Sequence, residues 1–338
     1  MNILYHLTIL PPQVPQAEAL SQEIAALRHR FGGDMMYLNP NIVSPVYLPR
    51  LLFGFHKLPE LRRHETRIDL HHVYNPDPFP FPILRLLRKP VVYSLSSGIG
   101  QKRPNLRYLS KLTAVTVPDE RSYERLRSWG LNNVHLVRAG IERGRFSHTP
   151  QPLNGKLRLL VASSPWTKAQ FQSKGIDALL TLAAQREDIE LVCLWRGVLL
   201  EEMQRRVSAH NLAGRVQVID RLVDVNEMLA TVHATVNLAT NAAIIKAYPH
   251  SLLDSLAAGK PVLVSRAIPM ADTVARTGCG VVVEAVTPEA IGQAVDELVA
   301  NYGEMMETAV QVGRRDFSLE AMIDSYHQVY RAALAGAV

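Results

Sequence analysis

Short apolar runs alternate with longer helical patterns along almost the whole chain, and this alternation constrains the fold more than any other feature. In the first half, expected strands cover residues 2–10, 68–74, 90–94, 112–117 and 134–137, and expected helices cover 16–31 and 119–129. Parallel strands need a crossover connection, which is usually a helix, so this order predicts βαβ units. The expected fold class is therefore α/β with parallel sheets.

A segment of linker composition, residues 146–156, divides this pattern in two. Beyond it the alternation begins again, with expected strands at 157–162, 190–195, 216–219, 234–238, 261–264 and 280–283, and expected helices at 176–185, 200–210, 226–231, 250–258, 288–302 and 318–334. We therefore expect two doubly wound domains, residues 1–148 and 149–317, followed by a closing helical segment, residues 318–338. Ligands of such folds bind at the carboxyl ends of the strands, here in a cleft between the domains.

Composition and missing motifs exclude several classes of protein. No uncharged apolar run approaches the ~20 residues needed to span a bilayer. Cys193 and Cys279 are the only cysteines, which excludes a disulfide scaffold and favours a reducing, cytoplasmic location. The chain has neither a G-x-G-x-x-G nor a Walker A sequence, which argues against dinucleotide dehydrogenases and P-loop NTPases. We expect no metal site, because no H-E-x-x-H or C-x-x-C sequence occurs.

The most informative stretch is K-A-Y-P-H-S-L-L-D-S-L-A-A-G-K-P-V, which begins at Lys246. It predicts a loop, a helix that starts near residues 249–251, and then a strand. At the helix start the N–H groups of Ser251, Leu252 and Leu253 would form an anion site suited to a phosphate. Asp254, one turn further on, would accept hydrogen bonds from sugar or ribose hydroxyls. The alternative is an ordinary loop–helix–strand unit whose acidic residue is stabilised by the helix dipole.

This stretch resembles the hallmark of family 4 glycosyltransferases, E-G-F-P-x-x-L-L-E-A-M-A-x-G-x-P-V. Four further segments resemble motifs of the same family in the same order: G-I-E at 140–142 with Phe146, K-G-I-D at 174–177, T-G-C-G at 277–280, and R-R-D-F-S at 314–318. The resemblance covers the chain from about residue 134 to the end. It implies a GT-B fold, in which two Rossmann-like domains face each other across a cleft and the last helix crosses back to the first domain.

The resemblance also implies an activity, the transfer of a sugar from a nucleotide-sugar donor to a glycan or lipid-linked acceptor with retention of configuration. The C-terminal domain of the family binds the donor and the N-terminal domain binds the acceptor. Carried over, Asp254 would hold the ribose and Lys174 would neutralise the leaving diphosphate. No metal or other cofactor is expected, because fixed cations and helix N-termini stabilise the developing charge. Surface polysaccharide or glycoconjugate synthesis is the expected setting.

Some positions depart from the family pattern. Lys246 replaces the glutamate that touches the donor sugar, which suggests an anionic donor sugar or an added contact to the diphosphate. At the end of strand 157–162, Ser163 lies in a donor-binding segment that lacks the usual Gly-Arg pair, and Lys168 or Arg196 would have to supply the missing cation. Bulkier residues, 14–16, replace the glycine pair that usually follows the first strand.

These departures leave two other functions open. One is a degenerate GT-B protein that binds nucleotide or glycan without catalysis and acts as a partner subunit. The other is a GT-B relative that works on the donor alone, such as a sugar-nucleotide epimerase.

His72 is a further candidate for catalysis, because D-L-H-H-V-Y-N at 69–75 resembles a family H-x-H-N pattern. The alternative role for His72 is a hydrogen-bonded histidine inside a buried strand.

The segment from Arg50 to Arg67 interleaves apolar and basic side chains. Residues 1–150 contain 20 lysines and arginines against 11 acidic residues, which favours an anionic partner. We expect this segment to contact an anionic membrane surface, which would make the protein peripheral on the inner face of the cytoplasmic membrane. The alternative is a helix that packs its apolar face on the first sheet. No nucleic-acid partner is expected, because no recognised nucleic-acid module is present.

Overall fold

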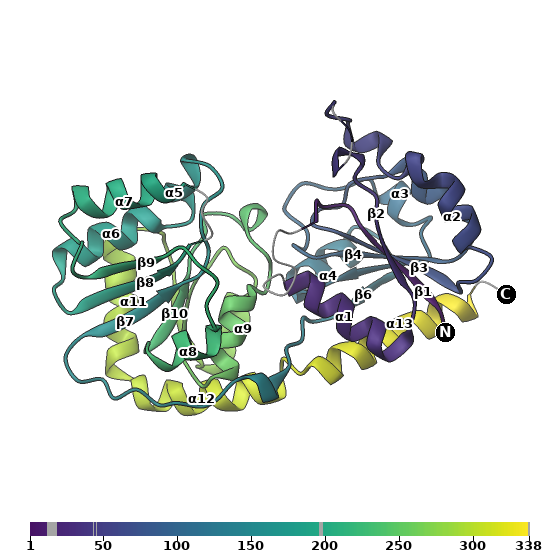
Figure 1. Cartoon of the computed structure of the whole chain (residues 1–338). Coiled ribbons are helices and arrows are strands. Elements are labelled where there is room, and N and C mark those ends of the chain that lie inside the picture. The colour runs from purple at the N-terminus through teal and green to yellow at the C-terminus, as the bar shows by residue number, and fades with distance from the viewer. Residues whose placement is uncertain (12–18, 43, 45, 196–198, 337–338) are drawn as a thin grey trace. The chain divides into compact units, whose positions relative to one another are not determined.

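The computed structural model describes residues 1–11, 19–42, 44, 46–195 and 199–336 (Figure 1). The chain forms two compact units, Met1–Gly140 with Leu319–Val338, and Ile141–Ser318. We expected the first changeover after residue 148. In the structure, residues 141–148 belong to the second unit. There Ile141 pairs with Ser318, and the Ser147 N–H donates to Asn226 Oδ1 at 2.9 Å.

The first unit is built on a six-stranded parallel sheet. Its strand order is β2 (Asp34–Tyr37), β1 (Ile3–Leu7), β3 (Leu70–Asn75), β4 (Val91–Leu95), β5 (Ala114–Val117) and β6 (Val134–Leu136). Every residue of β1, β3, β4 and β5 is buried, as expected for parallel strands with both faces covered. The helices of this unit are α1 (Ala19–Phe31), α2 (Leu58–His64), α3 (Leu106–Leu109), α4 (Glu120–Ser128) and α13 (Leu319–Ala335).

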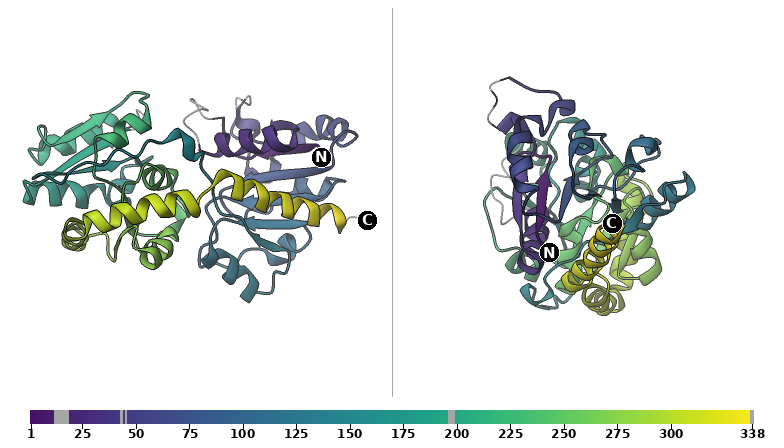
Figure 2. Two further views of the ribbon diagram at one scale, coloured as in Figure 1. Left: turned by 90° about the horizontal axis from the view of Figure 1, so that it is seen from below. Right: turned by 90° about the vertical axis from the view of Figure 1, so that its right-hand side faces the viewer.

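One face of this sheet is covered by α1 and α13, which contact each other although they lie at opposite ends of the chain (Figure 2). Apolar side chains of both helices join those of β1 and β3 in one cluster, which includes Leu20, Ile24, Met322 and Val329. A second cluster covers the other face and includes Leu61, Tyr108 and Leu126.

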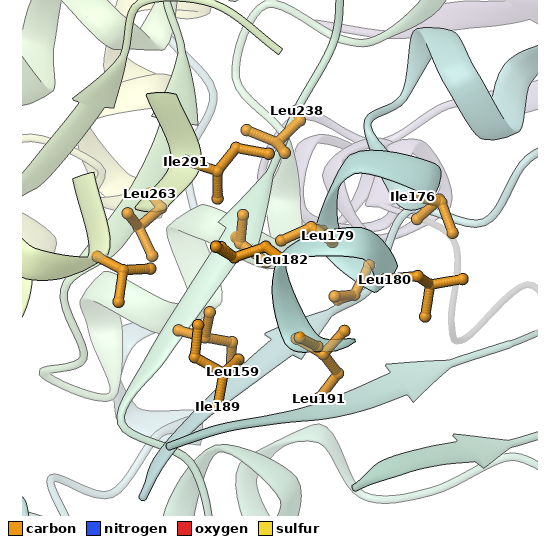
Figure 3. Close-up of a cluster of buried hydrophobic side chains, with 14 of the residues drawn as sticks. Leu159, Ile176, Leu179, Leu180, Leu182, Ile189, Leu191, Leu238, Leu263 and Ile291 are labelled. Carbon is orange, nitrogen blue, oxygen red and sulfur yellow. The ribbon is translucent and has the colours of Figure 1, made fainter. Parts of the chain in front are cut away.

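The second unit repeats the design. Its parallel sheet has the order β12 (Gly280–Val283), β11 (Val262–Ser265), β10 (Ala234–Asn237), β7 (Leu157–Val161), β8 (Ile189–Leu194) and β9 (Val216–Ile219). Its helices are α5 (Ala169–Ser173), α6 (Ile176–Gln185), α7 (Leu200–Ala209), α8 (Val225–Ala230), α9 (His250–Ala257), α10 (Met270–Thr277), α11 (Pro288–Ala300) and α12 (Tyr302–Arg315). Figure 3 shows Leu179 and Leu182 of α6 among core side chains that include Leu159 and Leu191 of the sheet.

A glycine lets α12 approach α9 closely. A Cβ atom at Gly313 would lie 2.4 Å from the carbonyl oxygen of Leu256, so no larger residue fits between the two helices as they stand. The packing matters because α9 carries the expected ribose-binding residue, Asp254.

Two parallel, doubly wound sheets confirm the expected α/β class. Among the described residues, no helix is both long and apolar enough to cross a membrane.

Candidate functional site

The carboxyl ends of β7, β10 and β11 lie side by side in the second sheet, since β10 pairs with both neighbours. The loops that follow these strands are tied together. The Ala239 N–H donates to Ser265 Oγ at 2.8 Å, and the Thr240 N–H donates to the Ser173 carbonyl at 2.8 Å. This edge is where open α/β sheets bind their ligands.

Lys174 lies at this edge as a buried cation. Its side chain is 7 % exposed, and Nζ donates to the Ser164 carbonyl at 3.0 Å and to Ser163 Oγ at 3.3 Å. No carboxylate among the described residues forms an ion pair with it, and burial lowers its pKa. A buried ammonium of this kind lacks an anion, and a bound phosphate would supply one.

The backbone after Lys174 admits only glycine. Gly175 has φ +70°, and a Cβ atom there would lie 2.7 Å from the side chain of Leu238. The K-G pair therefore holds the lysine between the end of α5 and the loop after β10.

Asp254 lies one turn into α9. Its carboxyl group has no hydrogen-bond donor among the described residues, and burial raises its pKa to about 7, an effect that the positive charge of Arg145 opposes. The carboxylate therefore has unused capacity to accept hydrogen bonds from hydroxyl groups.

The expected anion site at the start of α9 needs a correction. The N–H groups of Leu252 and Leu253 both donate to the Pro249 carbonyl, at 3.0 and 3.2 Å, so they are not available to a ligand. The N–H groups of His250 and Ser251 donate to no acceptor among the described residues. Of the three expected donors only Ser251 therefore keeps an available N–H group, and His250 joins it, because the carbonyl of the N-cap residue Pro249 accepts from the next two N–H groups of the helix.

Several polar side chains lie near the start of α9. Ser251 Oγ accepts a hydrogen bond of 3.3 Å from Nδ2 of Asn237, whose Oδ1 is buried without a partner. Lys246 is half-buried in the loop before α9. Burial and the nearby charge of Lys246 lower the pKa of His250 to about 3, so His250 is neutral near pH 7. Lys246 thus lies near His250 at the start of the helix, and Ser251 and Asp254 lie within its first turns.

Arg145 is the site residue that sequence reasoning missed. It ends the 3₁₀ turn η6 (Arg143–Arg145), and its charge acts on Asp254. The signal was present, because Arg145 lies inside the segment from Gly140 to Phe146 that carried part of the family resemblance.

The two candidates for the missing cation differ in what the structure says of them. Lys168 has a side chain that is 74 % exposed and lies 4.0 Å from Glu202 on α7, so it points to solvent. Arg196 lies outside the described residues, as do residues 14–16 of the expected phosphate loop.

His72 lies in the first unit and is fully buried in β3. Its Nδ1 is 2.7 Å from the Tyr330 hydroxyl, and its Nε2 is 2.7 Å from Ser94 Oγ. Burial lowers its pKa well below the usual range. This environment favours the alternative role, a hydrogen-bonded core histidine, because neither ring nitrogen is left to meet a substrate.

The segment from Arg50 to Arg67 is not one helix. It forms the 3₁₀ turns η3 (Arg50–Leu52) and η4 (Phe55–Lys57) and then α2, with Gly54 at φ +85° between the turns. Phe53 and Leu61 are buried in the core, whereas Leu51 and Leu52 are 54 % and 47 % exposed. Some apolar side chains of the segment are therefore packed inward, as the alternative expected, and others are exposed.

Three of the basic residues in this segment form ion pairs, Arg50 with Asp77, Lys57 with Glu60 and Arg62 with Glu65. The Arg50 guanidinium also lies 4.2 Å from the centre of the Phe79 ring.

Among the described residues, no group of three His, Cys, Asp or Glu side chains is placed to hold a metal ion.

Two doubly wound parallel sheets are the architecture of the GT-B fold. Residues 167–316 match the family described as glycosyl transferases group 1 and form a domain of that family, so the chain is a glycosyltransferase. No curated protein matches the sequence.

Solved structures of the same fold cover nearly the whole chain. Sucrose-phosphate synthase from Thermosynechococcus elongatus is 15 % identical with a TM-score of 0.78, and the match covers 99 % of this chain and 100 % of that one. A glycosyltransferase from Rickettsia africae is 12 % identical with a TM-score of 0.75, and 98 % of each chain is covered. Anabaena HepE in complex with UDP-glucose is 12 % identical with a TM-score of 0.71, over 97 % of this chain and 98 % of that one. At these identities the likeness confirms the fold alone.

Proposed function

We propose that the chain transfers a sugar from a nucleotide-sugar donor to a glycan or lipid-linked acceptor, in surface polysaccharide or glycoconjugate synthesis. The observation that carries this proposal is Lys174, a buried ammonium that donates to Ser163 and Ser164 and forms no ion pair with a carboxylate of the described residues. A diphosphate is the natural counterion for such a group at the carboxyl edge of a parallel sheet.

Each residue of the site has a part in the proposed reaction. Lys174 stabilises the negative charge that develops on the leaving diphosphate, and the free N–H groups of His250 and Ser251 add to it. Asp254 accepts hydrogen bonds from the ribose, and the charge of Arg145 favours its ionised form. Fixed cations take the place of a metal ion in this scheme, so we propose that transfer needs none.

Lys246 sets the chemical class of the sugar or adds to the diphosphate contacts. In either role its charge favours an anion, so Lys246→Glu should weaken donor binding. Unchanged binding and turnover in that variant would remove Lys246 from the site.

Similarity to other glycosyltransferases suggests which donor to test and which stereochemistry the transfer has. HepE from Anabaena has been solved with UDP and with UDP-glucose, so a uridine nucleotide is the first donor to test. The resemblance to family 4 glycosyltransferases supports retention of configuration.

The test is the thermal stability of the protein with millimolar UDP, GDP, ADP and their sugar forms. A ligand at about 100 times its Kd stabilises by ~2.7 kcal/mol, which is a shift of several degrees. We expect a shift with one nucleotide that disappears in Asp254→Ala and persists in Asp324→Ala, a matched exposed carboxylate on α13. If no nucleotide shifts the transition, the donor site is not where we place it.

We also propose that the exposed side of the segment from Arg50 to Arg67 rests on an anionic membrane surface, at the inner face of the cytoplasmic membrane. Leu51, Leu52 and Phe55 offer the apolar contact, and Arg63 and Arg67 add charge.

A further inference from the structure

A cavity of about 510 Å³ opens at the amino edge of the first sheet, the edge opposite to the carboxyl ends where such folds bind substrates. Residues just before β4 and just before β5 line it, among them Arg88, Lys89 and Lys111. They meet because β4 and β5 are adjacent parallel strands, with Val92 beside Ala114. The walls are completed by the 3₁₀ turn η5 (Pro82–Leu86) and by Gly336 at the end of α13.

Among the described residues, the lining carries positive charge alone. Its four charged residues are Arg85, Arg88, Lys89 and Lys111, and no acidic residue belongs to it. Like charges collected around one cavity repel one another and raise the local potential, which favours a bound anion.

None of these four side chains forms an ion pair with a described residue. The nearby carboxylate of Glu65 is already engaged, since it accepts from the Arg88 backbone N–H at 2.5 Å and pairs with Arg62 at 2.6 Å. Arg85 lies 5.1 Å from the centre of the Tyr108 ring, a contact that leaves its donors available. Elsewhere in the unit, cations such as Arg138 have an acidic partner.

The lining is also well anchored. The Val91 N–H donates to Thr113 Oγ1 at 2.9 Å and so joins the two segments that carry the cations. Leu84 and Leu112 are buried beneath them. The cations therefore stand on backbone that is fixed before any ligand arrives.

We propose that this cavity is a second binding site, separate from the donor site, which takes a phosphate or diphosphate group. Arginine presents paired N–H donors that match two phosphate oxygens, and lysine adds point charges. Free phosphate compounds and the phosphorylated headgroups of lipids share this chemistry.

The test begins with calorimetric titration of pyrophosphate into the full chain. Every protein in the series carries Lys174→Ala, so that the proposed donor site does not contribute. We expect Arg88→Glu/Lys111→Glu to weaken binding about tenfold or more. The control Arg30→Glu/Lys102→Glu makes the same change in net charge on exposed residues outside the lining, with Lys102 in the loop after the carboxyl end of β4, and should weaken binding less than about threefold. Arg88→Gln/Lys111→Gln repeats the test with a milder change if the first pair fails to fold.

Hydrogen exchange then locates the bound anion. Pyrophosphate should protect backbone amides in residues 84–91 and 111–113. The proposal fails if both charge-reversed pairs weaken binding equally, if protection falls elsewhere in the chain, or if the parent protein binds neither pyrophosphate nor vesicles.

Vesicles distinguish the two sources of phosphate. If sedimentation with phosphatidylglycerol–phosphatidylcholine vesicles depends on Arg88 and Lys111 and pyrophosphate competes with it, the site takes a lipid headgroup. If the same pair affects pyrophosphate binding and not sedimentation, the site takes a free phosphate compound.

Discussion

At the scale of single residues, Lys174 should have opposite effects on stability and on activity. Its burial without a carboxylate partner costs stability, whereas its charge serves the proposed leaving group. We expect Lys174→Met to leave the thermal midpoint unchanged or raised and to lower kcat/KM by about 10²–10³, as for the loss of one preorganised charge contact. Lys168→Met, at an exposed position at the other end of α5, is the control. A Lys174 variant that unfolds, or that keeps full activity, would contradict this expectation.

Asp254 should make donor binding depend on pH. Its pKa is raised to about 7, so the carboxylate that accepts ribose hydroxyls forms as pH rises through that value. Donor affinity should therefore increase from pH 6 to pH 8, and Asp254→Asn should abolish the increase. Titration of the donor at several pH values measures it, and a slope that persists in the variant would assign it to another group.

The sequence predicts Lys174 and Asp254 as site residues because each belongs to a short local motif. It did not find Arg145, which reaches Asp254 only through the tertiary fold. It was wrong about the amides of Leu252 and Leu253, because which N–H groups the Pro249 carbonyl accepts from depends on the exact residue at which the helix begins.

At the scale of elements, most strands of both sheets begin and end within a few residues of their expected bounds, because buried parallel strands are continuous apolar runs. The sequence did not predict strand β2, because D-M-M-Y contains no β-branched residue. Helix α12 was missed because it contains Gly303 and Gly313, which lower helix propensity. The segment from Arg50 to Arg67 is interrupted at Gly54, where the sequence already weakens a long helix because glycine lowers helix propensity.

The packing of α12 on α9 predicts a matched pair of substitutions. Gly313→Ala places a methyl group against the Leu256 carbonyl and should lower the free energy of unfolding by about 1–3 kcal/mol. Donor binding should weaken too, because α9 carries Asp254. Gly303→Ala lies on the same helix with nothing within 4 Å and should stabilise by up to about 1 kcal/mol. Denaturant unfolding of both variants measures the difference, and equal effects would show that the close approach is unimportant.

The exposed leucines of η3 predict how membrane contact responds to substitution. Leu51→Ser/Leu52→Ser removes apolar surface without changing charge and should weaken binding to anionic vesicles by about tenfold. Leu222→Ser/Val299→Ser removes exposed apolar side chains from the second unit and should have little effect. Sedimentation with vesicles compares the two, and equal loss in both would point to nonspecific adsorption.

At the scale of the whole molecule, the first unit should be the more acid-sensitive of the two. The second unit also contains histidines whose pKa burial lowers, His233 and His250, but there burial raises the pKa of Asp254, which works in the opposite direction as pH falls. His6, His71 and His72 are fully buried, and burial lowers the pKa of each, that of His71 to about 4. Below pH 6.5 the unfolded chain binds protons that the folded unit does not, so stability falls as pH falls. His71 alone should cost about 2 kcal/mol at pH 5.

Hydrogen exchange at pH 7 and pH 5 tests this expectation. Amides of β1 and β3 should lose protection at pH 5, and His71→Asn should reduce the loss. Equal loss in both units would mean that the buried histidines of the first unit do not control acid stability.

The first unit is made from the two ends of the chain, whereas the second is one continuous stretch. Tyr326 and Tyr330 of α13 fill the core beside His72, so the first sheet has its full cover only when the last helix exists. During synthesis, which proceeds from the N-terminus, residues 141–318 can complete their fold while the opening strands still wait for α13. The unit whose strands are translated first is therefore the unit that completes its core last, and its apolar sheet face stays uncovered until α13 has been translated.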